Sequence, residues 1–180
     1  MILIVAATER ELDGLRDAKT LVCGIGPVEA ALATAHAIGE RRPGVILHVG
    51  IAGARKLEPP ALVVGSDSVY CDLVDERSLI PRVERAAPDP GLLGVVRGAL
   101  PEAHVLPIAT SASVGGGTLC EVEAMEGFGV LRAAELGGVP AVELRAVSNA
   151  VDERVRSRWR FEDAFAALAE AIPRVLAALA

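Results

Sequence analysis

The sequence of 180 residues has almost no carboxamide side chains: Asn149 is its single asparagine, and it has no glutamine. Aromatic residues are also few, with one tryptophan, one tyrosine and three phenylalanines. No apolar run approaches the roughly 18 residues needed to cross a bilayer, and acidic residues follow the opening MILIVAA too closely for a signal peptide. These absences predict a cytoplasmic protein without a membrane partner.

Cysteines and clustered basic residues are scarce as well. Cys23, Cys71 and Cys120 are odd in number and form no C-x-x-C pair, which favours reduced thiols over a disulfide framework or a zinc site. The formal net charge is −6 and there is no basic block, so the charge that dominates nucleic-acid binding is missing. We therefore expect no metal, no nucleic acid and a small-molecule ligand.

Short apolar runs alternate with helix-like segments along the whole chain. Thr8 and Glu11 have capping-box spacing at the start of a predicted helix TERELDGLRDA, and Pro27 begins the next helix after the strand TLVCGIG. Further strands are predicted in GVILHVG, ending at the glycine-rich GIAGA, and in ALVVGSDSVY, AHVLPIAT and PAVELRAVS, with helices in PGLLGVVRGAL and EVEAMEGFGVLRAAELGG. This alternation predicts an α/β fold in one domain, residues 1–180, with a largely parallel sheet covered on both faces.

The last helix is predicted from about Phe161 to the end of the chain. Apolar residues recur there at the 3.6-residue spacing of a helix face, which predicts that they belong to the core: Phe165, Leu168, Ile172, Val175, Leu176 and Leu179.

Carboxylates and the single amide stand where predicted strands end, which is where ligands bind in parallel sheets. Glu9 and Glu11 follow the first strand, and Asn149 and Asp152 follow the last. For Glu9, a favourable contact with the helix dipole is the simpler interpretation. Glu126 has apolar neighbours in AMEGFG, which favours a position inside a site over a solvated helix face. Glu121 and Glu123 are expected on the same helix as Glu126.

The familiar phosphate-binding and nucleophile motifs are missing. CGIGPVEAA contains G-x-G but follows the second strand and lacks the third small residue of a dinucleotide fingerprint. The sequence contains neither G-x-x-x-x-G-K-[ST] nor G-x-S-x-G, which argues against P-loop chemistry and a hydrolase nucleophile elbow.

Four segments, in the same order, resemble the nucleoside phosphorylase and nucleosidase superfamily, whose members cleave the bond between a ribose and a base. VAATERE resembles the GAMEEE opening of methylthioadenosine nucleosidases, CGIGPVEAALA their SGIGK..AA turn, and EAMEGFG and RAVSNAVDER their ribose and base segments. EAMEG, RAVSN and the downstream Trp159 are most similar to futalosine hydrolases of the alternative menaquinone route. The resemblance implies a single-domain three-layer sandwich with a mixed, mostly parallel sheet, a homo-oligomer and no cofactor.

The resemblance also implies roles for individual residues. Glu11 would be the general base that activates water, Glu126 would hold the ribose 2′ and 3′ hydroxyls, and Met125 would pack under the sugar. Asn149 would face the purine and stabilise it as it leaves, since an amide both donates and accepts hydrogen bonds. Asp152 would fix the loop that carries Asn149, with a surface carboxylate as the alternative.

The rest of the expected site is less defined. The glycine turns, including Gly50, would line the ribose with backbone groups. SASVGGGTLCEVEAMEG has no aromatic residue to stack on a purine, so the base would rest on Val114, Trp159 or a partner subunit. Trp159 and Phe161 are candidates for an aromatic wall, with plain core packing as the alternative.

Hydrolysis is favoured over phosphorolysis, because His48 stands where the phosphorylases have an arginine before Gly50. Arg10 and Arg55 are near enough in the sequence to leave phosphate binding open. The sequence therefore predicts hydrolysis of the N-glycosidic bond of futalosine with release of hypoxanthine. A methylthioadenosine or adenosylhomocysteine nucleosidase and a non-catalytic nucleoside sensor are the alternatives.

Overall fold

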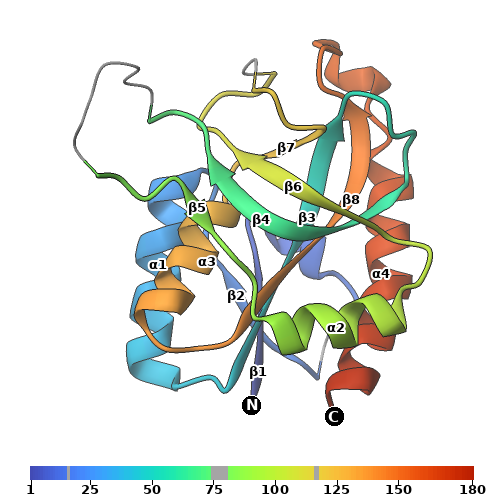
Figure 1. Cartoon of the computed structure of the whole chain (residues 1–180). Coiled ribbons are helices and arrows are strands. Elements are labelled where there is room, and N and C mark those ends of the chain that lie inside the picture. Colours follow the sequence, from blue (N-terminus) through green and yellow to red (C-terminus); the bar gives the residue numbers. More distant parts are fainter. Residues whose placement is uncertain (16, 74–80, 116–117) are drawn as a thin grey trace.

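The computed structural model describes residues 1–15, 17–73, 81–115 and 118–180 (Figure 1). Its strands are β1 (Ile2–Ala6), β2 (Lys19–Val22), β3 (Val45–Ala54), β4 (Leu62–Tyr70), β5 (Arg85–Ala86), β6 (His104–Thr110), β7 (Val122–Ala124) and β8 (Ala141–Ala150). Its helices are α1 (Pro27–Arg41), α2 (Pro90–Ala99), α3 (Gly127–Leu136) and α4 (Phe161–Leu179), with short 3-10 helices η1 (Glu9–Leu12) and η2 (Arg156–Arg158).

The strands form one mixed sheet. β1 pairs in parallel with β2 and with β3, and β3 pairs in parallel with β8. β8 then pairs antiparallel with β4, β4 pairs in parallel with β6, and β6 pairs in parallel with β7. β7 returns to β3 in antiparallel orientation. The mixed, mostly parallel sheet of the prediction is confirmed, but five strands also close into a ring, β3–β8–β4–β6–β7, which the sequence pattern did not predict.

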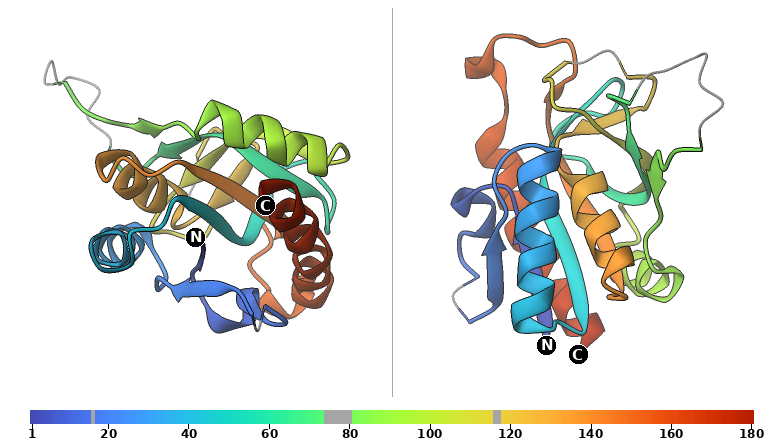
Figure 2. Two further views of the ribbon diagram at one scale, coloured as in Figure 1. Left: turned by 90° about the horizontal axis from the view of Figure 1, so that it is seen from below. Right: turned by 90° about the vertical axis from the view of Figure 1, so that its left-hand side faces the viewer.

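Helices cover the sheet on two sides (Figure 2). The side chains of β1 alternate between them: Leu3 and Val5 pack with α1 and α3, while Ile4 and Ala6 pack with α2 and α4. All four side chains are fully buried. Burial of one such aliphatic side chain of Leu, Ile or Val size stabilises a fold by about 1.5–3 kcal/mol. The apolar run at the start of the chain therefore joins both helical layers through the sheet.

The helices α1 and α3 approach each other closely at their first turns. A Cβ on Gly129 of α3 would overlap the Pro27 carbonyl oxygen of α1, so only glycine permits this approach. The contact brings Gly26, the residue before α1, to the carboxylate of Glu126, the residue before α3. Two segments 100 residues apart in the sequence thus meet beside the sheet.

The core of α4 is confirmed at Leu168, Ile172 and Val175, which are all buried. Leu176 and Leu179 are partly buried and pack against the same cluster. Phe165 differs from the prediction, because it lies nearer the start of the helix and lines a cavity.

Several predicted boundaries were wrong. Asn149 was expected to follow the last strand but lies within it, because β8 continues to Ala150 and pairs there with β3. The helix of TERELDGLRDA is only the short η1, which is followed by Gly14 at φ +85°. The strand of GVILHVG does not end at GIAGA, because β3 continues to Ala54. EVEA is not helical: Val122–Ala124 form β7, since they pair with both β3 and β6. Glu121, Glu123 and Glu126 therefore do not share a helix.

Candidate active site

A cavity of about 360 Å³ lies at the carboxyl ends of β1, β3 and β8, which run in the same direction. Its lining comes from segments throughout the chain: Ala7, Thr8, Arg10, Glu11, Ile25, Ile51, Ala52, Gly53, Ser113, Val114, Gly115, Glu123, Ala124, Met125, Glu126, Ser148, Asn149, Val151, Arg156, Trp159, Phe161 and Phe165. The structure therefore brings together Glu11, Met125, Glu126, Asn149 and Trp159 from the residues that the sequence singled out.

Glu11 enters the cavity from η1, directly after β1. Its Oε2 accepts hydrogen bonds from the Thr8 backbone N (2.9 Å) and Thr8 Oγ1 (2.8 Å), so the predicted pairing of Thr8 with Glu11 is confirmed. Its Oε1 accepts a hydrogen bond from the Ile51 backbone N of β3 (3.0 Å). These three donors fix the carboxylate: Oε2 uses both of its lone pairs for Thr8, whereas Oε1 keeps one lone pair for a further donor in the cavity.

Glu126 is far from Glu11 in the sequence but lines the same cavity, and only 4% of its surface is exposed. Its Oε1 accepts a hydrogen bond from the Gly26 backbone N (3.2 Å), and its Oε2 lies 3.4 Å from Arg145 Nη2. Burial raises the pKa of Glu126, which Arg145 and the Gly26 N–H partly oppose, whereas the charges of Glu11 and Glu143 add to the increase. Burial therefore disfavours the charged form of Glu126, and additional hydrogen-bond donors or a nearby cation would stabilise it.

Arg145 of β8 connects the carboxylates beneath the cavity. Its Nε donates to Glu143 Oε1 (2.8 Å), and Glu143 also accepts a hydrogen bond from Ser68 Oγ. Arg145 and Glu143 are almost completely buried. Burial lowers the pKa of Arg145, but the charges of Glu143, Glu126 and Glu11 outweigh this effect and raise the pKa above its usual value. Three carboxylates surround one guanidinium, so the cluster has a formally negative charge.

His48 of β3 is the neutral partner of this cluster. Its Nε2 lies 2.5 Å from Arg145 Nη2, and its Nδ1 lies 3.0 Å from the Val5 carbonyl oxygen. Because a guanidinium only donates, Nε2 must accept and Nδ1 must carry the proton. Complete burial and then the charge of Arg145 lower the pKa of His48 well below its usual value. The histidine thus positions Arg145 instead of supplying a cation to a ligand.

Gly50 does not line the cavity, although the resemblance implied that it would. It lies inside β3, where an added Cβ would overlap Arg145 Nη1 and lie 2.9 Å from Glu11 Oε1. In the structure Gly50 makes room for the charged cluster that supports the cavity. Gly127 does the same for Glu143, whose carboxylate occupies the space that a Cβ there would fill.

Asn149, near the end of β8, is another polar residue of the cavity lining and is 7% exposed. Its Oδ1 accepts a hydrogen bond from Ser148 Oγ (2.7 Å), and its Nδ2 donates to the Ala150 carbonyl oxygen (2.8 Å). The Ala150 carbonyl oxygen only accepts, so it fixes which end of the amide is the donor and leaves Oδ1 to accept from Ser148. One lone pair on Oδ1 and one hydrogen on Nδ2 remain for a ligand.

Aromatic side chains form the outer wall. Trp159 and Phe161 have ring centroids 5.3 Å apart, and Phe161 and Phe165 are stacked at 6.3 Å. Trp159 Nε1 donates to the Glu153 carbonyl oxygen (2.9 Å), which fixes the indole. The wall that was predicted for Trp159 and Phe161 thus has a third member in Phe165, and Met125 and Val114 line the same cavity.

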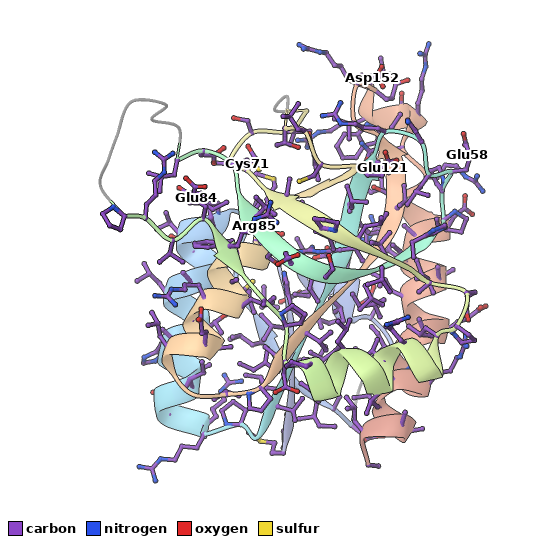
Figure 3. All side chains as sticks on the ribbon, in the orientation of Figure 1. Glu58, Cys71, Glu84, Arg85, Glu121 and Asp152 are labelled. Atoms are coloured by element: carbon purple, nitrogen blue, oxygen red, sulfur yellow. The ribbon has the colours of Figure 1, made fainter. Side chains whose placement is uncertain are left out.

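Asp152 is exposed and is not among the cavity-lining residues (Figure 3). The structure thus agrees with the alternative of a surface carboxylate. Of the two arginines that left phosphate binding open, Arg55 donates to Glu123 and to the Thr118 and Cys120 carbonyl oxygens. Arg10 lines the cavity but pairs with Glu162 (2.5 Å) and lies over the Phe165 ring.

The structure also limits the chemistry available to other groups. Burial, followed by the charge of Glu126, raises the pKa of the Cys23 thiol to about 12, so it is not a thiolate nucleophile at neutral pH. Within residues 1–15, 17–73, 81–115 and 118–180, no group of three or more His, Cys, Asp or Glu side chains is arranged to hold a metal ion. Across the same ranges, every helix is too short or too polar to span a bilayer.

Several residues of the site were not singled out from the sequence, notably Arg145, Glu143, Ser148 and Phe165. A usable signal was present for two of them. Glu143 and Arg145 are two residues apart in an otherwise apolar strand, so they lie on one face of it, and buried charges are kept only when they are paired.

Comparison with known proteins agrees with this geometry. A family model described as Phosphorylase superfamily matches residues 19–180. The chain therefore belongs to this superfamily, as the sequence predicted. Within it, the chain is 35% identical to the futalosine hydrolase of Streptomyces coelicolor, over 86% of this chain and 77% of that protein.

Solved structures show the same fold. A futalosine hydrolase mutant of Helicobacter pylori superimposes with a TM-score of 0.85 at 18% identity, covering 97% of each chain. The adenosylhomocysteine nucleosidase of Streptococcus pyogenes, in complex with 5-methylthiotubericidin, also gives a TM-score of 0.85, at 22% identity, over 97% of this chain and 95% of that one.

Proposed function

We propose that this protein hydrolyses the N-glycosidic bond of futalosine and releases hypoxanthine, without a cofactor. One observation carries the proposal: Glu11, Glu126 and Asn149 line a single cavity in a chain that is 35% identical to a futalosine hydrolase. The reaction belongs to the alternative menaquinone route, as the resemblance in the sequence implied. Residues 1–180 act as one nucleosidase domain, since β1 and β8, from opposite ends of the chain, both pair with β3.

Glu11 is the proposed general base. Cleavage of an N-glycosidic bond passes through a state in which positive charge develops at the ribose ring. Water then attacks C1′, the bond from C1′ to the purine nitrogen breaks, and Glu11 accepts a proton from the water. The hydrogen bonds from Thr8 and Ile51 hold its carboxylate in a fixed direction, so little reorganisation is needed during the reaction.

Glu126 is proposed to bind the ribose hydroxyls. Two hydroxyl donors would offset the cost of its burial, which is the main cause of its raised pKa. The charge excess of Glu11, Glu126 and Glu143 over Arg145 favours a cation in the cavity. Because positive charge at the sugar is larger in the transition state than in bound substrate, this interaction accelerates the reaction and does not only tighten binding.

Asn149 is proposed to receive the base. Its remaining acceptor and donor match the N7 and O6 edge of a 6-oxopurine, with water supplying any proton that the leaving purine takes up. Trp159, Phe161 and Phe165 provide apolar surface for the bound nucleoside, and Met125 packs under the sugar.

Water, not phosphate, is the proposed nucleophile. Arg145 is enclosed by carboxylates, Arg55 is bound to Glu123, and Arg10 is paired with Glu162. A phosphate ion beside Glu11 and Glu126 would therefore meet carboxylates whose buried guanidinium, Arg145, is already paired. Arg156, the other arginine in the cavity lining, lies over the Trp159 ring.

A homo-oligomer is the proposed assembly. Val28 and Leu32 project from one face of α1, four residues apart, and are 65% and 64% exposed. Ile25, 61% exposed, continues this apolar face to the cavity, so a second copy packed there would also cover the site. A Leu32→Asp variant should shift the mass measured by light scattering to that of a smaller species.

A cytoplasmic location is proposed because Cys23, Cys71 and Cys120 are all free thiols.

Methylthioadenosine or adenosylhomocysteine nucleosidase activity is the second candidate, because of the fold shared with the Streptococcus pyogenes enzyme. The test is release of free base from futalosine, aminofutalosine and methylthioadenosine. Hypoxanthine release from futalosine with the highest kcat/KM supports the proposal. A higher kcat/KM for methylthioadenosine would replace it with the second candidate, and binding without release from any of the three would identify a sensor.

A further inference from the structure

The aromatic wall of the cavity has a guanidinium at each end. Arg10 lies over the Phe165 ring, with its Cζ 4.7 Å from the ring centroid, and Arg156 lies over the Trp159 ring at 5.8 Å. Both arginines are part of the cavity lining. Contact with the face of a ring leaves the N–H edge of a guanidinium free to donate hydrogen bonds. The wall therefore holds two cations beside the space for a ligand.

The two cations differ in their partners. Arg10 pairs with Glu162 (2.5 Å). Arg156 is exposed and forms no ion pair or hydrogen bond with any residue that the structure describes. Glu153, three residues earlier in the chain, pairs with Arg158 instead (3.3 Å). The charge of Arg156 is therefore available to a ligand in the cavity.

Charges of opposite sign thus lie in different parts of one cavity. Glu11 and Glu126 line it and are buried, whereas Arg156 lines it and is exposed. A ligand matches this arrangement if it places hydroxyl groups at the buried carboxylates and an anion at the exposed arginine.

The chemistry of a nucleoside limits where that anion can be. The base and the ribose hydroxyls are uncharged at neutral pH, so only the substituent at C5′ can carry a negative charge. The rings of Trp159, Phe161 and Phe165 favour an apolar arm between the ribose and the anion over a phosphate attached directly to C5′. A carboxylate at the end of such an arm matches the planar fork of a guanidinium.

We propose that Arg156 binds a carboxylate on the 5′ substituent of the nucleoside, and so selects nucleosides with an anionic 5′ arm over neutral ones. This inference rests on the proposed function and adds to it a residue that reads the 5′ end of the substrate. Futalosine has a carboxylate on its 5′ substituent, whereas the methylthio group of methylthioadenosine is neutral. Arg156 thus separates the proposed substrate from that of the second candidate by charge.

The direct test is calorimetric binding of futalosine and of its methyl ester, in which the carboxylate is replaced by a neutral group. The Glu11→Gln protein is used so that both ligands stay intact. We expect the Kd of the ester to exceed that of futalosine by about tenfold or more, since hydrogen bonds to charged groups are the stronger class. Adding Arg156→Gln should bring the two Kd values together. A ratio that does not change on this substitution would overturn the inference.

Arg154→Gln is the matched control. Arg154 is exposed and two residues from Arg156, but it is not among the cavity-lining residues. Its variant loses the same charge and should keep the ratio of the two Kd values. Arg156→Lys retains the charge and should keep a preference for futalosine over its ester. If Arg156 only packed on Trp159, Arg156→Gln would weaken both ligands alike, which would contradict the inference.

Kinetics in the background with Glu11 intact gives a second readout. Arg156→Gln should raise the KM for futalosine by about tenfold and change kcat by less than about twofold, because the contact is made away from the bond that breaks. An unchanged KM would contradict the inference.

Failure of the proposed function has a different signature. Futalosine would still bind more tightly than its methyl ester, with a ratio that depends on Arg156, but the wild-type protein would release no hypoxanthine. Equal binding of the two ligands, or binding of neither, would instead overturn the inference. Ligand binding and turnover therefore test the two proposals separately.

Discussion

Arg145 occupies the space that a side chain on Gly50 would need, because a Cβ there would overlap its Nη1 and approach Glu11 Oε1 to 2.9 Å. Two adjacent strands thus share one buried position, which holds the guanidinium between the carboxylates of the cavity. The buried guanidinium of Arg145 therefore depends on the absence of a side chain at Gly50.

Gly50→Ala should consequently destabilise the fold by about 1–3 kcal/mol, the usual cost of forcing an extra methyl into a packed interior. The measurement is urea-induced unfolding followed by circular dichroism. Gly94→Ala is the control: Gly94 lies in α2 with no atom within 4 Å of an added Cβ, so alanine there should raise the free energy of unfolding by about 0.5–1 kcal/mol. Equal stability of Gly50→Ala and the wild-type protein would show that Arg145 has room to move.

Glu11→Gln should keep nucleoside binding and lose turnover. The amide still accepts the hydrogen bond from Ile51, but it cannot take a proton from water, so kcat should fall by about 10²–10⁴-fold. Steady-state kinetics with futalosine provides kcat, and calorimetry provides the affinity. Glu9→Gln, an exposed neighbour outside the cavity lining, should retain wild-type kcat. An active Glu11→Gln enzyme would remove Glu11 as the base.

Asn149→Asp should shift the preference toward 6-aminopurine nucleosides. A carboxylate accepts from an exocyclic amine but repels O6, so the ratio of kcat/KM for futalosine to that for aminofutalosine should fall by at least about tenfold. Asp152→Asn changes charge by one unit on the neighbouring exposed loop and should leave the ratio unaltered. If both variants keep the wild-type ratio, Asn149 does not contact the base.

Glu126 should make stability depend on pH in a defined direction. Its pKa is raised by burial, so the folded state holds the proton more strongly than the unfolded state, and stability is lost as pH rises from the usual glutamate value of 4.5 through the raised pKa. Glu126→Gln lacks this titration. Unfolding free energies measured across this range should therefore fall with pH in the wild-type protein relative to the variant. A constant difference between the two proteins would show that Glu126 titrates normally.

Much of the fold could be predicted because local patterns agree with it. The apolar run at the start, Pro27 and the periodic face of the last helix led to β1, α1 and α4 near their observed positions. β7 was missed, since Val122–Ala124 is too short to show an alternating pattern and a helix follows at Gly127. The ring of strands was also missed, because it depends on both edges of β8, and pairing partners are not encoded locally.

The site divides in the same way. Glu11 and Asn149 were found because they stand near the ends of apolar strand-like runs, where ligands bind in parallel sheets. Glu126 was found because its neighbours in AMEGFG are apolar. Arg145 and Gly50 were not understood, because their relationship exists only across the β3–β8 pair, in which Gly50 is aligned with Arg145. Phe165 has the spacing of a core residue, and only the tertiary position of the start of α4 places it in the cavity.

Release of hypoxanthine from futalosine, measured in phosphate-free buffer and again with increasing phosphate, tests the central claim most directly. A hydrolase in which Arg10, Arg55 and Arg145 are paired with carboxylates as described should give the same kcat in both conditions and a free sugar as the second product. Release that requires phosphate, with a sugar 1-phosphate as the product, would contradict the account and make the protein a phosphorylase.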